Sequence, residues 1–282
     1  MNLMEYPRED YSISHFARAN SYELAGRELY LVMDSGLDYI LTIDEEKCSW
    51  HIKGESAKQA PYMCFKADDT TFFLSFDVSD LENHTYVLDF EQRLVTQLIC
   101  RKGVHPVNPH IMERVFTFGA IRMLGYKLPY KRHTFSAEHL GTTVQWRWSP
   151  QLFTRHAYLE SDWYRITWED EGAAAEDFDE TNEMLPSTDE HAKYIKIKEN
   201  MFLFSLTEET EERMLGDLQH FRCDNLTLLQ NYDRMMQVGR GVGDVQRSGE
   251  AGYRHIFVPL AAFGSPVELP EAFLNARNPF TV

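Results

Sequence analysis

The stretch 154–168, TRHAYLESDWYRITW, concentrates side chains that can do acid–base chemistry. A turn at 160–161 predicts a hairpin here, and the side chains of a strand alternate between its two faces. One face then carries a mixed polar and aromatic set, namely Thr154, His156, Tyr158, Trp163, Arg165 and Thr167. An imidazole next to a phenol and a guanidinium can move a proton while its neighbours stabilise an oxyanion. We therefore predict that His156, Tyr158 and Arg165 are catalytic.

This face of the predicted hairpin has two further interpretations. A histidine on a strand is often a hydrogen-bonded structural residue, and aromatic side chains next to arginine also mark protein–protein interfaces. Exposing a large aromatic side chain costs about 1.5–3 kcal/mol, which argues against plain surface. The face is therefore a pocket wall, an interface between domains or subunits, or a polar-lined core.

The composition is that of a globular protein. Of the 282 residues, 43% are hydrophobic and 13% are aromatic, enough to fill one large or two medium cores. The net charge of −16 argues against nucleic acid and anionic membranes as partners, because binding phosphates needs a basic face. The first residues show no basic segment followed by an apolar run, and no apolar stretch is long enough to span a membrane. We expect a cytoplasmic protein.

No motif for a metal or a cofactor stands out. None of the 11 histidines is paired at a spacing that specifies zinc or iron. The four cysteines form no C-x-x-C pair and are expected to be buried thiols: Cys48, Cys64, Cys100 and Cys223. The run GRGVGDV from Gly239 lacks the spacing of a dinucleotide-binding loop, and we interpret it as a bulged or turning strand. We expect no metal and no cofactor.

Short runs of aromatic and β-branched residues, separated by Gly, Asp, Asn and Glu turns, predict an all-β fold with few short helices. Helical periodicity is visible only around 109–116 and 207–218. In the hairpin 37–54 we predict one apolar face, with Tyr39, Leu41, Ile43, Cys48, Trp50 and Ile52. Its opposite face, which includes His51, has an ordinary half-solvated pattern.

The two halves of the chain resemble each other, which predicts an internal duplication. YMCFKADDTTFFLSFDVSD from Tyr62 resembles YIKIKENMFLFSLTEET from Tyr194. NHTYVLDFEQRLVTQLI from Asn83 resembles NLTLLQNYDRMMQVGRG from Asn225. Both asparagines fit the glycosylation pattern, but we interpret them as strand starts.

Two similar barrel domains joined by a linker explain this repeat. We place the N-terminal barrel, with an N-terminal extension, at 1–125, the linker at 126–140 and the C-terminal barrel at 141–282. The C-terminal barrel includes the acidic stretch 169–190, typical of a solvated loop, and a C-terminal tail. The linker concentrates Lys127, Lys131, Arg132 and His133, which either balance acidic neighbours or form an anion site.

The sequence also resembles a known family. KRHTFSAEHLG, VQWRWSP, RHAYLESDWYRITW, YIKIKENMFLFSL and QVGRGVG resemble the C-terminal half of MoaF-like proteins. GRELYLVM, DYILTIDEEKCSWHI, YMCFKADDTTFFLSFDV and YVLDFEQRLVTQLI resemble their first domain. The resemblance spans about residues 20–265 and implies two tandem calycin-like or lipocalin-like antiparallel β-barrels. It supplies no established catalytic residues and does not imply molybdenum-cofactor synthesis.

The predicted site combines the hairpin face with motif positions of that resemblance. Besides the three catalytic candidates, we predict substrate-binding roles for Trp146, Trp148, Trp163, His133 and Arg240. A small barrel can enclose one hydrophobic ligand. We therefore expect a cofactor-independent lyase, isomerase or cyclase that acts on a small, largely apolar intermediate. This expectation rests in part on analogy with other proteins of the same fold. One alternative is a carrier or sensor of such a ligand, and another is a structural or partner-binding protein. The protein could also form a homodimer.

Overall fold

The computed structural model describes residues 13–104, 106, 112–170, 188–207, 213–215, 218–247, 251 and 254–275. Within these ranges, the side chains of 168–170, 188, 213–223, 245–247 and 272 lie outside the description. The chain forms two compact units, which we call the first and the second unit. The first comprises Ala19–Thr134 and Ile195–Met201, and the second comprises Met1–Arg18, Phe135–Tyr194 and Phe202–Val282.

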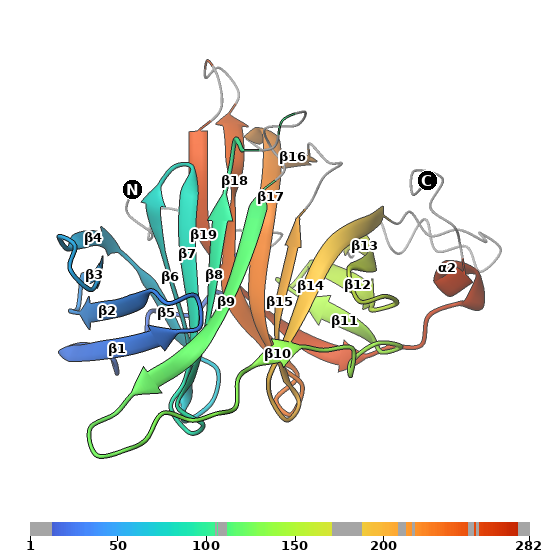
Figure 1. The fold of residues 1–282 in the computed structure, drawn as a ribbon. Helices are drawn as coiled ribbons and strands as arrows, with labels where there is room; N and C mark the ends of the chain where they lie inside the picture. The colour runs from blue at the N-terminus through green and yellow to red at the C-terminus, as the bar shows by residue number, and fades with distance from the viewer. Residues whose placement is uncertain are drawn as a thin grey trace. The chain divides into compact units, whose positions relative to one another are not determined.

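The first barrel is an antiparallel sheet with the strand order β4-β3-β2-β1-β9-β8-β7-β6-β5 (Figure 1). Its strands are β1 (Arg27–Met33), β2 (Asp38–Ile43), β3 (Lys47–Ile52), β4 (Lys58–Pro61), β5 (Met63–Lys66), β6 (Thr71–Ser79), β7 (Glu82–Asp89), β8 (Leu94–Arg101) and β9 (Glu113–Arg122). Only Tyr62 separates β4 from β5, the two edges of the sheet. The sheet therefore nearly closes into a barrel, as predicted.

The interior of the first barrel follows the predicted alternation. In the β2–β3 hairpin Tyr39 lies opposite Ile52, and Leu41 lies opposite Trp50. These residues belong to the buried core or pack against it. The apolar face predicted for this hairpin is confirmed, and its burial supplies the main driving force for closing the sheet.

The second barrel has the strand order β10-β14-β13-β12-β11-β19-β18-β17-β15, and an additional pairing of β14 with β15 closes it. Its strands are β10 (Thr134–Phe135), β11 (Thr143–Arg147), β12 (Leu152–Ala157), β13 (Trp163–Asp170), β14 (Thr188–Lys198), β15 (Met201–Thr207), β16 (Arg213–Leu215), β17 (Leu218–Asn231), β18 (Met236–Arg247) and β19 (Arg254–Pro266). A short helix, α2 (Glu271–Asn275), follows β19.

The two barrels repeat the same local devices, which confirms the duplication. A glycine with a positive φ precedes β1 and another precedes β11, with φ values of 78° at Gly26 and 83° at Gly141. Their N–H groups donate to equivalent carbonyl groups at the end of the next strand, those of Ile43 and Tyr158. A left-handed conformation favours glycine because a Cβ would be strained there.

The repeated asparagines have structural roles. The amide of Asn83 donates to the carbonyl of Phe76 at 3.1 Å, and the amide of Asn225 donates to the carbonyl of Leu206. Both asparagines are at most 2% exposed. Each fixes the pairing of two neighbouring strands. Asn83 lies at the start of β7, as predicted, but Asn225 lies in the middle of β17, so its interpretation as a strand start is wrong.

The segments with helical periodicity form strands wherever the structure describes them. β9 begins at Glu113, and β15 ends at Thr207. Short apolar runs fit both the helical and the strand period, so pairing with neighbouring strands decides which structure they adopt. The glycine run also lies in a strand, β18, where a Cβ at Gly239 would lie 2.0 Å from the carbonyl oxygen of Thr227. The close approach of the β17 backbone to β18 therefore explains why this position is a glycine.

Within the described residues, no helix is long and apolar enough to cross a membrane.

Candidate functional site

The hairpin formed by β12 and β13 has a different register from the predicted one. His156 lies opposite Ile166, and Ala157 lies opposite Arg165. The connection therefore has an odd number of residues, whereas a turn at 160–161 requires an even number. Because directly opposite residues share a face, the prediction that His156 and Arg165 share a face is wrong.

His156 belongs to a buried chain of hydrogen bonds inside the second barrel. Trp148 Nε1 donates to Thr154 Oγ1 at 2.9 Å, and this hydroxyl lies 2.9 Å from His156 Nε2. The other ring nitrogen, Nδ1, lies 3.2 Å from the hydroxyl of Tyr158. All four side chains are at most 1% exposed. Both nitrogens of His156 therefore have partners in the barrel interior.

The hydroxyl of Tyr158 is the centre of this network. It accepts hydrogen bonds from Trp146 Nε1 at 3.1 Å and from Gln230 Nε2 at 2.8 Å. Burial raises the pKa of Tyr158 to about 12 and lowers the pKa of His156 to about 3. Both side chains are therefore uncharged at neutral pH. This geometry fits a polar-lined core, and the catalytic roles of these residues stay a prediction.

Arg165 and Trp163 lie on the other face of β13. Arg165 forms a two-pronged ion pair with Asp189, at 2.7 Å from Nε to Oδ1 and 2.9 Å from Nη2 to Oδ2. It also donates to the carbonyl of Phe273 in α2. The ring of Trp163 lies 5.9 Å from the guanidinium carbon. Arg165 thus joins β13, β14 and α2.

Two further predicted residues lie apart from the hairpin. His133 belongs to the first unit, where Nδ1 lies 2.8 Å from Thr96 Oγ1 and Nε2 lies 3.7 Å from Asp89 Oδ2. Arg240 in β18 is fully buried and donates to the carbonyl of Asn225 at 3.2 Å. The structure therefore brings Trp146 and Trp148 together with His156, but not these two residues.

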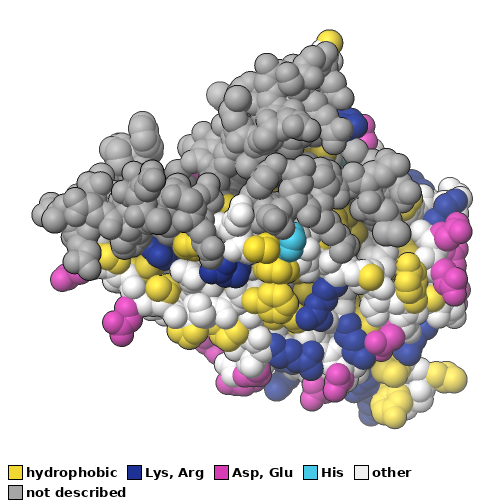
Figure 2. All heavy atoms as spheres, turned by 180° about the vertical axis from the view of Figure 1, so that it is seen from behind, with side chains coloured by type: hydrophobic (Ala, Val, Ile, Leu, Met, Phe, Trp, Pro, Cys, Tyr) yellow, Lys and Arg dark blue, Asp and Glu magenta, His cyan; other side chains and the backbone are white. Residues whose placement is uncertain are grey.

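The basic stretch between β9 and β10 is mostly exposed. Arg132 forms an ion pair with Asp34 at 2.8 Å. Leu124 and Tyr130 have exposed fractions of 100% and 103%. Figure 2 shows Lys and Arg side chains next to hydrophobic side chains on one face of the molecule.

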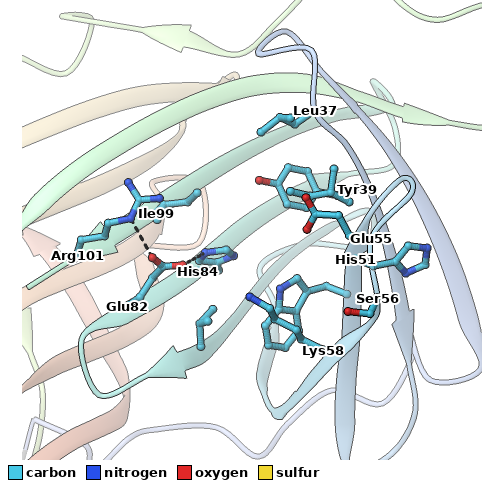
Figure 3. A pocket seen from close by; sticks show the side chains of 13 residues that line it. Leu37, Tyr39, His51, Glu55, Ser56, Lys58, Glu82, His84, Ile99 and Arg101 are labelled. Atoms are coloured by element: carbon cyan, nitrogen blue, oxygen red, sulfur yellow. Dashed lines mark hydrogen bonds and ion pairs between the residues drawn. The ribbon is translucent and has the colours of Figure 1, made fainter.

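A pocket of about 230 Å³ lies at one end of the first barrel (Figure 3). Strand ends and turns from β1–β2, β3–β4, β6–β7 and β8 surround it. Its apolar wall is formed by Leu37, Tyr39, Trp50, Ile52, Val78 and Ile99. Its polar side chains are His51, Glu55, Ser56, Lys58, Glu82, His84 and Arg101. An apolar wall with a few converging polar groups is typical of a small-molecule site.

Three of the pocket residues form a connected charge relay. Glu82 and His84 lie on the same face of β7, and Glu82 Oε1 is 2.9 Å from His84 Nε2. Arg101 lies opposite Glu82 on β8, and its Nε donates to Glu82 Oε2 at 2.9 Å. The hydrogen bond with His84, followed by the one with Arg101, lowers the pKa of Glu82 to about 2. Glu82 is therefore a carboxylate at neutral pH.

This carboxylate determines which nitrogen of His84 is free. An ionised carboxylate only accepts hydrogen bonds, so Nε2 of His84 must carry a hydrogen. In the neutral ring Nδ1 is then left with a lone pair. Nδ1 is buried and has no hydrogen-bond partner among the described residues. His84 lines the pocket, so this lone pair is a candidate proton acceptor there.

This relay is not among the features predicted from the sequence. The signal is present in Glu82-Asn83-His84, because residues two apart share a strand face. Arg101 and Lys58 come from other strands, and only the pairing of β7 with β8 and of β3 with β4 brings them to the same barrel end.

Among the described side chains, no group of three His, Cys, Asp or Glu residues is arranged to hold a metal ion. Cys48, Cys64 and Cys100 are buried free thiols, as predicted, and Cys223 lies outside the described side chains. Burial raises the pKa of Cys48 and of Cys64 to about 12.

Comparison with known proteins finds a family similarity in the first barrel. The sequence profile described as MoaF N-terminal domain matches residues 11–102. This region is similar to the MoaF N-terminal domain. The resemblance to MoaF-like proteins is thereby confirmed, and the pocket residues lie within the matched region or, for Arg101, at its end.

Other comparisons add little to the MoaF assignment. No match was found among curated proteins. A crystal structure from Burkholderia vietnamiensis, described as a "putative beta-lactamase", is 14% identical, with a TM-score of 0.30. The match covers 37% of this chain and 98% of that one. A likeness of this size supports no statement about chemistry.

Proposed function

We propose that the protein is a cofactor-independent lyase, isomerase or cyclase that binds a small, largely apolar molecule in the first barrel. His84 is the general base of this reaction. The observation that supports the proposal is the free Nδ1 of His84, which is buried at the pocket while Nε2 is held by Glu82. An enclosed imidazole with an orienting carboxylate is a common arrangement for proton transfer.

The chemistry needs only groups of the chain. Nδ1 of His84 takes a proton from a C–H bond of the substrate, and the electron pair of that bond stays on the substrate. The imidazolium that forms is stabilised by the negative charge of Glu82, 2.9 Å away. The proton then returns to another atom of the substrate in an isomerase or cyclase, or to the leaving group in a lyase.

The surroundings of His84 favour this role. The imidazole ring lies 5.7 Å from the ring of Phe76 and 6.4 Å from that of Trp50. His84 itself is 6% exposed. Burial of the imidazole next to these rings strengthens the electrostatic interaction of imidazolium and carboxylate.

Deuterium incorporation into 2-indanone in D₂O tests the proposal. This bicyclic ketone is small and apolar, and its C–H bonds next to the carbonyl are acidic. We expect the protein to accelerate incorporation above the buffer rate and His84→Gln to remove the acceleration. His255→Gln in the second barrel is the matched control and keeps it.

Two other outcomes of this experiment would contradict the proposal. Binding of 2-indanone without acceleration would favour the carrier alternative. Loss of acceleration in His156→Gln rather than in His84→Gln would move the catalytic site to the second barrel, where the sequence predicts it. Circular dichroism spectra establish that each variant is folded.

A further inference from the structure

We infer that Tyr39 and Lys58 bind an oxyanion in the first barrel, so that the substrate is a carbonyl compound with an acidic C–H bond beside the carbonyl group. This inference rests on the proposed function and adds the substrate class to it. It starts from the polar groups of the pocket that remain available to a ligand.

Two charged groups of the pocket are already occupied. Glu82 accepts from His84 and from Arg101, both at 2.9 Å. Arg101 also forms an ion pair with Glu113 at 3.3 Å. Neither the carboxylate of Glu82 nor the guanidinium of Arg101 is therefore the first choice for a ligand.

The hydroxyl of Tyr39 is available. Tyr39 points to the interior of the barrel from β2 and is 5% exposed. Its ring lies 6.3 Å from the ring of Tyr86, which holds it against the core. Within the described part of the chain, its hydroxyl makes no hydrogen bond. A phenol that is fixed in place and unpaired is a suitable hydrogen-bond donor to an oxyanion.

The ammonium group of Lys58 is also available. Lys58 lies opposite Trp50 in the β3–β4 pair, so that both side chains are on the inner face. It forms no ion pair with any described residue, including Glu55 at the same pocket. Lys58 is exposed, so solvent and salt screen its charge and reduce its contribution.

The directions of these groups favour a shared ligand. In Figure 3, Tyr39 and Lys58 extend from one wall of the pocket towards the side where His84 lies. A carbonyl compound placed between the walls has its C–H bond near His84 and its oxygen near Tyr39 and Lys58. When His84 Nδ1 takes the proton, the C–H electron pair forms a carbon–carbon double bond. The carbonyl π pair moves to the oxygen, which becomes an enolate stabilised by the two donors.

Binding of 4-nitrophenol tests the inference without turnover. Its phenolate resembles an enolate, and the ionised and neutral forms absorb at different wavelengths. We expect the wild-type protein to bind the phenolate about tenfold more tightly than the phenol, the gain of a charge-assisted hydrogen bond, and to lower the apparent pKa of the bound probe. The neutral ether 4-nitroanisole is expected to bind about as weakly as the phenol.

Matched variants assign the effect to the two residues. Tyr39→Phe and Lys58→Met are each expected to reduce the preference for phenolate about threefold, while 4-nitroanisole binding changes little. Tyr22→Phe and Lys53→Met, which lie outside the pocket lining, are the controls and keep the preference.

Two results would overturn the inference. Binding of 4-nitrophenol and 4-nitroanisole with equal affinity would mean that the pocket does not recognise an oxyanion, although deuterium exchange into 2-indanone could still support the proposed function. A preference for phenolate that survives in the Tyr39→Phe and Lys58→Met double variant would place the recognition elsewhere.

Discussion

Nε2 of His84 lies 2.9 Å from the carboxylate of Glu82, two residues earlier in the same strand. The pleat of β7 places both side chains on the inner face, and the pairing with β8 adds Arg101 opposite Glu82. A strand end and one cross-strand neighbour are therefore sufficient to orient the imidazole.

Glu82→Gln is expected to slow deuterium exchange into 2-indanone by at least about tenfold while leaving its binding affinity nearly unchanged, because the amide cannot stabilise the imidazolium. Initial rates and dissociation constants measured on the same samples separate the two effects. Equal losses of rate and affinity would indicate that Glu82 only maintains the shape of the pocket.

Tyr158→Phe is expected to destabilise the protein by about 2 kcal/mol, because the buried donors of Trp146 and Gln230 lose their acceptor. Urea unfolding measures this change. Tyr126→Phe, at a position that is 65% exposed, is the control and should be neutral. A neutral Tyr158→Phe would contradict the hydrogen-bond network described for the second barrel.

His139→Phe is expected to stabilise the protein by about 1 kcal/mol. Both ring nitrogens of His139 are buried without a partner among the described residues, and the rings of Tyr158, Tyr194 and Phe202 surround it. Thermal melting at neutral pH measures the gain. A lower melting temperature would show that the imidazole has a polar partner.

The same variant has a predicted pH dependence. Burial lowers the pKa of His139 from 6.5 to about 4, so between these values the unfolded chain binds a proton that the folded chain does not. Its contribution makes the wild type lose stability as the pH falls from about 6.5 to about 4. The advantage of His139→Phe should therefore grow on acidification. An advantage that stays constant across this range would rule out this titration.

Arg165→Met is expected to cost about 3 kcal/mol, because it leaves the buried carboxylate of Asp189 without its partner. The double variant Arg165→Met, Asp189→Leu should recover most of this loss, since no charge is then left unpaired. Urea unfolding of Arg165→Met, Asp189→Leu and the double variant, together with the wild type, completes this double-mutant cycle. A double variant as unstable as Arg165→Met would show that packing, and not the ion pair, is lost.

The alternation of Tyr39, Leu41 and Ile43 predicts a strand and its buried face, and the repeated asparagines at 83 and 225 predict the duplication. The register of β12 and β13 is not predictable in the same way, because apolar and polar residues alternate equally well around an odd or an even connection. The predicted proximity of His156 and Tyr158 does not depend on this register, because the two residues are only two positions apart in the chain. The predicted proximity of Arg165 does depend on it, because Arg165 lies on the paired strand. The pocket depends on residues from six strands, and its shape follows only from closure of the barrel.

Nuclear magnetic resonance of protein labelled with ¹⁵N in its histidines tests the central claim most directly. Nε2 of His84 is expected to carry the ring hydrogen that Glu82 accepts, and the Nδ1 resonance is expected to shift when 4-nitrophenol or 2-indanone enters the pocket. A hydrogen on Nδ1, or an Nδ1 resonance that neither probe changes, would contradict a proton-transfer site in the first barrel.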